Sequence, residues 1–155
     1  MTRKQLDRVC GELAVADLGA PLSAALAATS PETWDHLREL LQRVERFAPR
    51  FVGGDAARNP QSQFPEAEAN ALVDYLNGAG LVVPFDWTNW LEVVGPSDAD
   101  PTARIAECTA EECLGYLTAI FRAARFVEGS FEQQFVDGYP QLILGRLLDL
   151  MHGRV

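Results

Sequence analysis

The apolar residues of this chain recur mainly at intervals of three and four, the spacing that places them on one face of an α-helix. The clearest case is residues 31–47, whose apolar positions are Trp34, Leu37, Leu40, Leu41, Val44 and Phe47. Ser30 is a favourable N-cap, Pro31 suits the first helical position and Pro49 marks the end. The pattern therefore predicts a helix that begins at residue 31 and buries one face.

Similar patterns predict helices elsewhere. Residues 2–16 place Leu6, Val9, Cys10 and Leu13 at helical spacing, Gly19 and Pro21 interrupt this pattern, and an Ala-rich segment follows. Pro65 begins a helix that ends at Asn77-Gly78, with an apolar stripe made of Ala69, Leu72, Val73 and Leu76. After an extended stretch from Leu81 to Val83, Asp86 can cap a short helix, and Asp100-Pro101 can open another turn.

Two longer helices are predicted in the C-terminal third. Thr109 and Glu112 form a capping-box pattern before a helix that we expect to reach about Val127, with a core stripe of Cys113, Leu117, Ile120, Phe121 and Ala124. The last helix, from Pro140 to about Met151, is apolar on most sides. Such a helix is either largely buried or lies at an interface, so a homodimer through this C-terminal helix is one expectation.

Strand signals are weak, because no long alternating run and no hairpin dipeptide occurs. Residues 51–63 have the glycines, proline and polar residues of a loop. The expected fold is all-α, a single compact domain of about six or seven helices, some short, with little or no strand. We expect residues 1–30 to be an N-terminal helical extension and residues 31–155 to be the helical core domain.

Composition agrees with a globular domain, since 48% of the 155 residues are hydrophobic. No apolar run is long enough to span a membrane and the charged N-terminus does not resemble a signal peptide, so we expect a cytoplasmic protein. The three cysteines, Cys10, Cys108 and Cys113, include no CxxC pair. They are expected to be reduced core residues, and no metal or cofactor site is predicted.

Acidic residues account for the net charge of −9, and their excess lies in the middle of the chain. Residues 61–121 contain ten acidic residues but one basic residue, Arg104. Such a stretch would repel a phosphate backbone, so no nucleic-acid role is expected. It is either a solvated face or a docking face for a basic partner.

The stretch FRAARFVEGS, residues 121–130, contains the most site-like feature. On the helix, Arg122 and Arg125 share a face with Glu111, Gly115 and Thr118, and the two small residues would let another group approach closely. The arginines either grip an anion with their planar donors or form an internal ion network, with Glu128, Asp137 or Asp86 as acceptors.

Other chemistry is sparse. No phosphate loop, nucleophile elbow or HExxH motif occurs, so no catalytic residue is assigned. Trp87 and Trp90, beside Phe85, are either an aromatic patch for a ligand or core anchors. The candidate ligand-binding residues are Arg122, Arg125, Glu128, Thr118, Trp87 and Asp86.

Two stretches, GLVVPFDWTNW at 80–90 and TAIFRAARFVEGSFEQQFVDGYPQLILGRL at 118–147, carry a family resemblance. They resemble an uncharacterised bacterial family, domain of unknown function 6508, with its Thr-x-x-x-Arg-x-x-Arg-Phe-x-x-Gly pattern before a helix closed by Arg-Leu. These positions are Thr118, Arg122, Arg125, Phe126, Gly129, Arg146 and Leu147, and the resemblance covers residues 32–151. Many relatives have an acidic-Gly-His stretch where this chain has Glu128-Gly129-Ser130. The resemblance implies a mainly helical domain and no reaction.

Two functions are therefore compared. The first is a non-enzymatic binding or protein-interaction module, because no catalytic constellation is present and the chain has both an apolar last helix and an acidic middle. The second is a small-ligand binder or enzyme whose anionic substrate is gripped by Arg122 and Arg125. In it, Glu128 or Asp86 would act as acid or base.

Overall fold

The computed structural model describes residues 18–51, 63–94 and 101–152, and these ranges contain helices and no strand. The eight helices described are α2 (Ala20–Ala28), α3 (Pro31–Glu45), α4 (Glu66–Gly78), α5 (Trp87–Val94), α6 (Pro101–Ala106), α7 (Ala110–Ala123), α8 (Ser130–Asp137) and α9 (Tyr139–His152). The all-α prediction is confirmed. The helix predicted over residues 2–16 lies outside the described residues.

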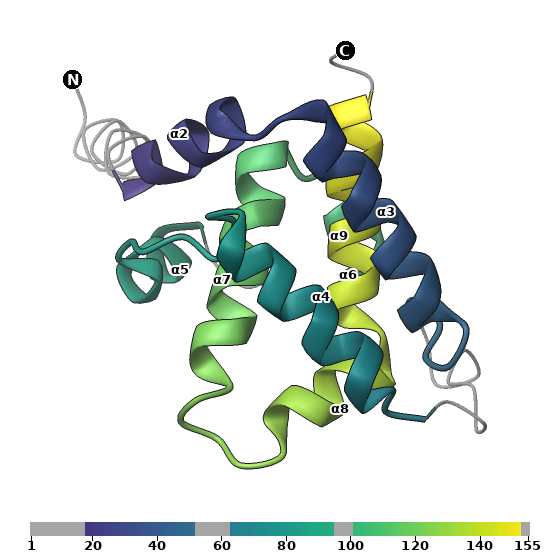
Figure 1. The fold of residues 1–155 in the computed structure, drawn as a ribbon. Coiled ribbons are helices and arrows are strands. Elements are labelled where there is room, and N and C mark those ends of the chain that lie inside the picture. Colours follow the sequence, from purple (N-terminus) through teal and green to yellow (C-terminus); the bar gives the residue numbers. More distant parts are fainter. Residues whose placement is uncertain (1–17, 52–62, 95–100, 153–155) are drawn as a thin grey trace, which may run out of the picture.

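Helix α9 forms the centre of the described fold, because it packs against α3, α6, α7 and α8. Figure 1 shows it (yellow) beside α3 (blue), with α4 crossing in front of the bundle. The apolar residues of α9, which suggested either a buried helix or an interface, are buried in the chain's own core. Among them are Ile143, Leu144, Leu147 and Leu148. Leu22 and Leu26 of α2 belong to the same core, so this part of the N-terminal region is packed on the domain.

The helix starts follow the capping residues in the sequence. Ser30 accepts a hydrogen bond from the backbone N–H of Thr33 at the start of α3. Thr109 and Glu112 form the predicted capping box at the start of α7, where each side chain accepts from the other residue's backbone N–H at 3.1 Å. These groups satisfy donors that a helix N-terminus leaves unpaired.

Two predicted helix ends were placed too late. Helix α3 ends at Glu45, and Phe47 lies 47% exposed while Ala48 is fully buried, so assigning Phe47 to the buried face is wrong. Helix α7 ends at Ala123, where N–H groups begin to bond three residues back, as in Phe126 to Ala123. The helix α8 was not predicted. It lies between Gly129 and Gly138, which both have positive φ.

Candidate functional site

The α7 face that carries Gly115, Thr118 and Arg122 holds another part of the same chain. A Cβ atom at Gly115 would lie 2.5 Å from Cη2 of Trp90, so the glycine allows the indole ring to lie against the helix. Trp90 is 2% exposed and packs edge-on against Phe85 and Tyr116. Trp90 is therefore a core anchor of α5, and the small residue at 115 serves that packing.

One turn further along α7, two side chains bind the extended segment between α4 and α5. The backbone N–H of Val83 donates to Oγ1 of Thr118 at 3.2 Å, and Thr118 is fully buried. Nη2 of Arg122 donates to the carbonyl oxygen of Val82 at 3.5 Å. Because buried backbone groups need partners, these contacts let residues 81–83 lie in the core without a neighbouring strand.

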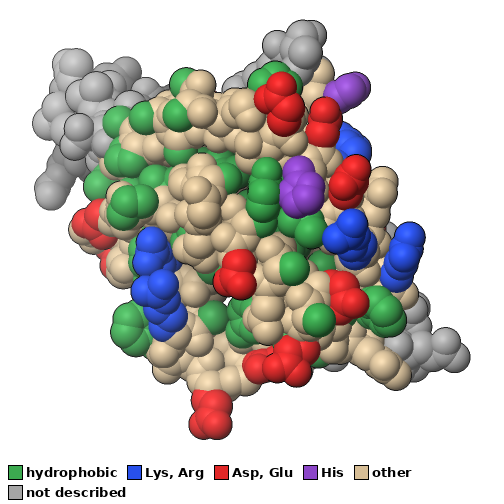
Figure 2. Space-filling model, in the orientation of Figure 1, with side chains coloured by type: hydrophobic (Ala, Val, Ile, Leu, Met, Phe, Trp, Pro, Cys, Tyr) green, Lys and Arg blue, Asp and Glu red, His purple; other side chains and the backbone are tan. Residues whose placement is uncertain are grey.

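The motif residues that follow Arg122 up to Gly129 are exposed. We call residues 122–128 the α7–α8 corner, where the chain leaves α7 and turns through Gly129, with φ of 79°, into α8. Phe126 is 82% exposed and Val127 is 58% exposed, and Arg125 and Glu128 are exposed as well. Figure 2 shows two neighbouring basic side chains (blue) on the side of the molecule where α7 ends, with hydrophobic side chains (green) beside them.

No carboxylate pairs with the arginines of the corner in the part of the chain that the structure describes. Two of the three internal acceptors considered for them have other partners. Asp86 accepts from the backbone N–H and Nδ2 of Asn89 at 3.3 and 2.6 Å, and Asp137 accepts from Nε2 of Gln133 at 3.0 Å. The described residues thus lack the internal ion network that was the alternative to a binding role.

The six candidate ligand-binding residues fall into separate groups. Thr118 and Arg122 bind the segment 81–83, whereas Arg125 and Glu128 lie exposed on the corner. Trp87 is half-buried at the start of α5, and Asp86 caps that helix. Among described residues, neither Asp86 nor Trp87 forms a hydrogen bond with either arginine. That these residues together bind one anion is still a prediction.

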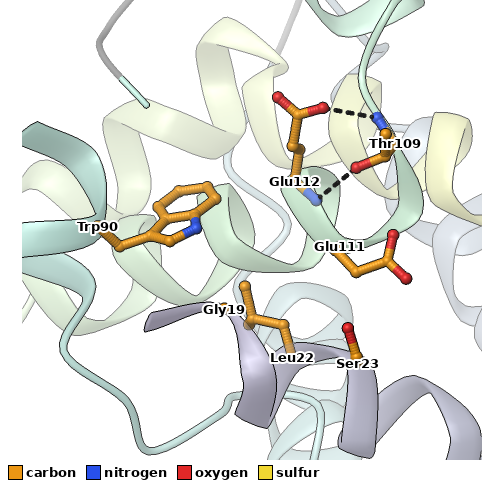
Figure 3. Close-up of a pocket in the computed structure, with 7 residues that line it drawn as sticks. All are labelled: Gly19, Leu22, Ser23, Trp90, Thr109, Glu111 and Glu112. Atoms are coloured by element: carbon orange, nitrogen blue, oxygen red, sulfur yellow. Dashed lines mark hydrogen bonds between the residues drawn. The ribbon is translucent and has the colours of Figure 1, made fainter. Parts of the chain in front are cut away.

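A separate hollow of about 300 Å³ lies between α2, α5 and the start of α7. Figure 3 shows Trp90 on one side of it, Leu22 and Ser23 together on α2 at the bottom, and Glu111 on the side of α7. Sequence reasoning missed it because its walls come from three elements far apart in the chain. Its volume is at the lower limit of ligand pockets. No group of three or more His, Cys, Asp or Glu residues able to hold a metal occurs in the described ranges.

The fold and the corner define an all-α protein with an exposed arginine and aromatic motif. The chain belongs to the family of unknown function DUF6508, whose model matches residues 29–153. No curated protein and no solved structure matches it. No described helix has the length and apolarity needed to cross a membrane.

Proposed function

We propose that this protein is a non-enzymatic interaction module whose docking surface is the α7–α8 corner. The observation that carries the proposal is the exposure of Phe126 and Val127 beside Arg125, in the stretch that carries the family pattern. Single exposed apolar side chains are common on folded domains, whereas contiguous apolar patches mark interaction surfaces. Here two consecutive ones remain at the surface.

The energetics of the corner suit binding. Burial of a Phe or Val side chain stabilises a complex by about 1.5–3 kcal/mol relative to leaving it exposed. Arginine and aromatic residues are enriched among the residues that dominate interface energies, because they combine a large contact area with directed donors. Phe126 would supply the apolar anchor and Arg125 the directed contact.

The charge of the corner indicates the chemistry of the partner. The chain has 22 acidic residues but 13 basic ones, and the corner arginines still form no ion pair in the described ranges. A partner that presents a carboxylate next to an apolar side chain would pair with Arg125 and cover Phe126. A homodimer through α9 has less support, because the apolar residues of α9 are already buried within one chain. A basic partner on the acidic middle is the other arrangement that the charge favours.

The alternative is a small anionic ligand held at the same arginines. The observation that favours it is the lack of a carboxylate partner for Arg122 and Arg125 in the described residues. Against it, Arg122 already donates to Val82, and Thr118 is fully buried under the segment it binds. Docking through Arg125 and Phe126 needs no rearrangement of those contacts.

The chain supplies a matched control for the test. Arg46 and Phe47 form a second exposed Arg-Phe pair just after α3, where Phe47 is 47% exposed. Wild type, Arg125→Ala/Phe126→Ser and Arg46→Ala/Phe47→Ser would each be immobilised and exposed to extract from cells that express the protein. Captured proteins would then be quantified by mass spectrometry.

The proposal predicts that wild type and the control pair retain the same partner and that the corner variant loses it. Equal retention by all three proteins would contradict it. A thermal-shift screen with phosphates and small carboxylic acids tests the alternative, since a ligand at about 100 times its Kd stabilises the folded state by about 2.7 kcal/mol. Stabilisation by one anion that is lost in Arg122→Ala/Arg125→Ala would favour a small-ligand site.

A further inference from the structure

Cys108 and Cys113 lie together at the other end of α7, although they are five positions apart in the sequence. Thr109 is the N-cap of α7, so Cys108 directly precedes the cap and Cys113 is the fourth residue of the helix. These two positions commonly pack against each other beside a capping box. Cys108 is 2% exposed and Cys113 is fully buried, and both belong to the same core cluster.

The surroundings make the two thiols unequal. The Cys113 thiol lowers the pKa of Cys108 most, and the nearby Arg104 adds to this effect while burial and Glu112 oppose it. The Cys108 thiol, together with burial, raises the pKa of Cys113. Cys108 is therefore the thiol that more readily becomes a thiolate, and Cys113 more readily keeps its proton.

The position of Cys108 is fixed from several sides. Its Sγ hydrogen-bonds to the carbonyl oxygen of Arg104 at 3.3 Å, and its own carbonyl oxygen accepts from Nε of Arg146 on α9 at 3.4 Å. Nη2 of Arg104 also donates to the hydroxyl of Tyr116 on α7 at 2.9 Å. Helix α6 is thus bonded to α7 and Cys108 is bonded to α9, so Cys108 is held beside Cys113.

We propose that Cys108 and Cys113 are a modification site, a dithiol that a hydroperoxide oxidises to an intrachain disulfide. In the first step the Cys108 thiolate attacks one peroxide oxygen. An S–O bond forms, the O–O bond breaks, and the leaving oxygen takes a proton to become an alcohol or water. Sulfur loses two electrons to the peroxide and becomes a sulfenic acid.

In the second step Sγ of Cys113 attacks Sγ of Cys108. The S–S bond forms, the S–O bond breaks, and the departing hydroxide takes the thiol proton and leaves as water. Two thiols and one hydroperoxide thus give one disulfide, one alcohol and one water. Because both thiols are almost fully buried, oxidation proceeds only as fast as the α6–α7 junction opens.

The test uses the full chain carrying Cys10→Ser, so that only the two thiols of interest remain. The folded protein would be treated with hydrogen peroxide, and free thiols would then be alkylated. Trypsin cleaves after Arg104 and Arg122, so both cysteines fall in one peptide, residues 105–122. The proposal predicts that this peptide carries no alkyl group and is two hydrogen atoms lighter than the free dithiol, and that a reductant added before alkylation restores the doubly alkylated form.

Single variants assign the roles. Cys113→Ser is predicted to leave Cys108 as a sulfenic acid that dimedone labels, whereas Cys108→Ser leaves Cys113 unlabelled. Far-UV circular dichroism verifies that each variant is folded. A doubly alkylated peptide after a peroxide dose that fully oxidises free glutathione would overturn the proposal, as would conversion of Cys108 to sulfinic acid with Cys113 still free. Labelling of Cys113 in Cys108→Ser would overturn the assignment of the nucleophile.

Discussion

Replacing Gly115 by alanine tests whether the central α7 face is shaped to hold Trp90. The new Cβ would lie 2.5 Å from Cη2 and 2.6 Å from Cζ2 of the indole. Carbon atoms that are not bonded to each other do not approach this closely. The ring cannot easily withdraw, because Trp90 is 2% exposed and lies against Phe85 and Tyr116. The helix or the ring must therefore shift.

The magnitude follows from two opposing effects. Alanine is favoured over glycine in a helix interior by about 1 kcal/mol. Overpacking a core costs about 1–3 kcal/mol, and a clash with a rigid, buried ring belongs in the upper part of that range. We expect Gly115→Ala to lower the free energy of unfolding by about 1–2 kcal/mol, measured by urea denaturation followed by far-UV circular dichroism.

Gly145 in α9 is the matched control. A Cβ there would lie 2.6 Å from Nη1 of Arg50, but this atom is the end of a flexible, partly exposed side chain. Gly145→Ala is expected to be neutral or stabilising by up to about 1 kcal/mol. In a Trp90→Leu background, Gly115→Ala should lose its cost. If Gly115→Ala is as stable as wild type, or behaves like Gly145→Ala, the indole does not constrain this face.

Two further predictions concern single positions and use the same urea assay. Thr118→Val removes the acceptor for the buried N–H of Val83 and is expected to cost about 1–3 kcal/mol, whereas Thr118→Ser keeps the acceptor and should cost clearly less; equal costs would contradict the role of this hydrogen bond. Gly138→Ala combines a φ of 88° with contact between the new Cβ and the backbone after α3, so it should cost more than Gly129→Ala, where φ is 79° and the surrounding space is open. An equal loss of stability in the two variants would show that the close backbone contact at Gly138 does not affect the free energy of unfolding.

Local signals were sufficient for much of the fold. The caps at Ser30 and Thr109 depend on hydrogen bonds within one turn, so the sequence alone indicated where α3 and α7 begin. Helix ends were less predictable, because Phe47 has the spacing of a core residue but the chain turns away before this residue reaches the core. This outcome is decided by tertiary packing that local spacing does not encode.

In the candidate site, too, local spacing predicted some features and tertiary packing decided the others. Spacing correctly placed Gly115, Thr118 and Arg122 on one helix face and indicated a close approach there. What approaches is the segment that carries Val82, Val83 and Trp90, at least 25 residues away in sequence, and no local pattern identifies it. The contact between Cys108 and Cys113 was missed because only Cys113 lies on the helix.

The central claim is that the α7–α8 corner docks a partner, and site-specific photo-crosslinking tests it most directly. A photoreactive phenylalanine analogue would replace Phe126 in one protein and Phe47 in another, both produced in cells that naturally express the chain. Both positions are exposed, so neither replacement should unfold the domain. The account predicts a discrete crosslinked partner at position 126 that is absent at position 47 and is lost when Arg125→Ala is added. The same adducts at both positions, or none at 126, would contradict it.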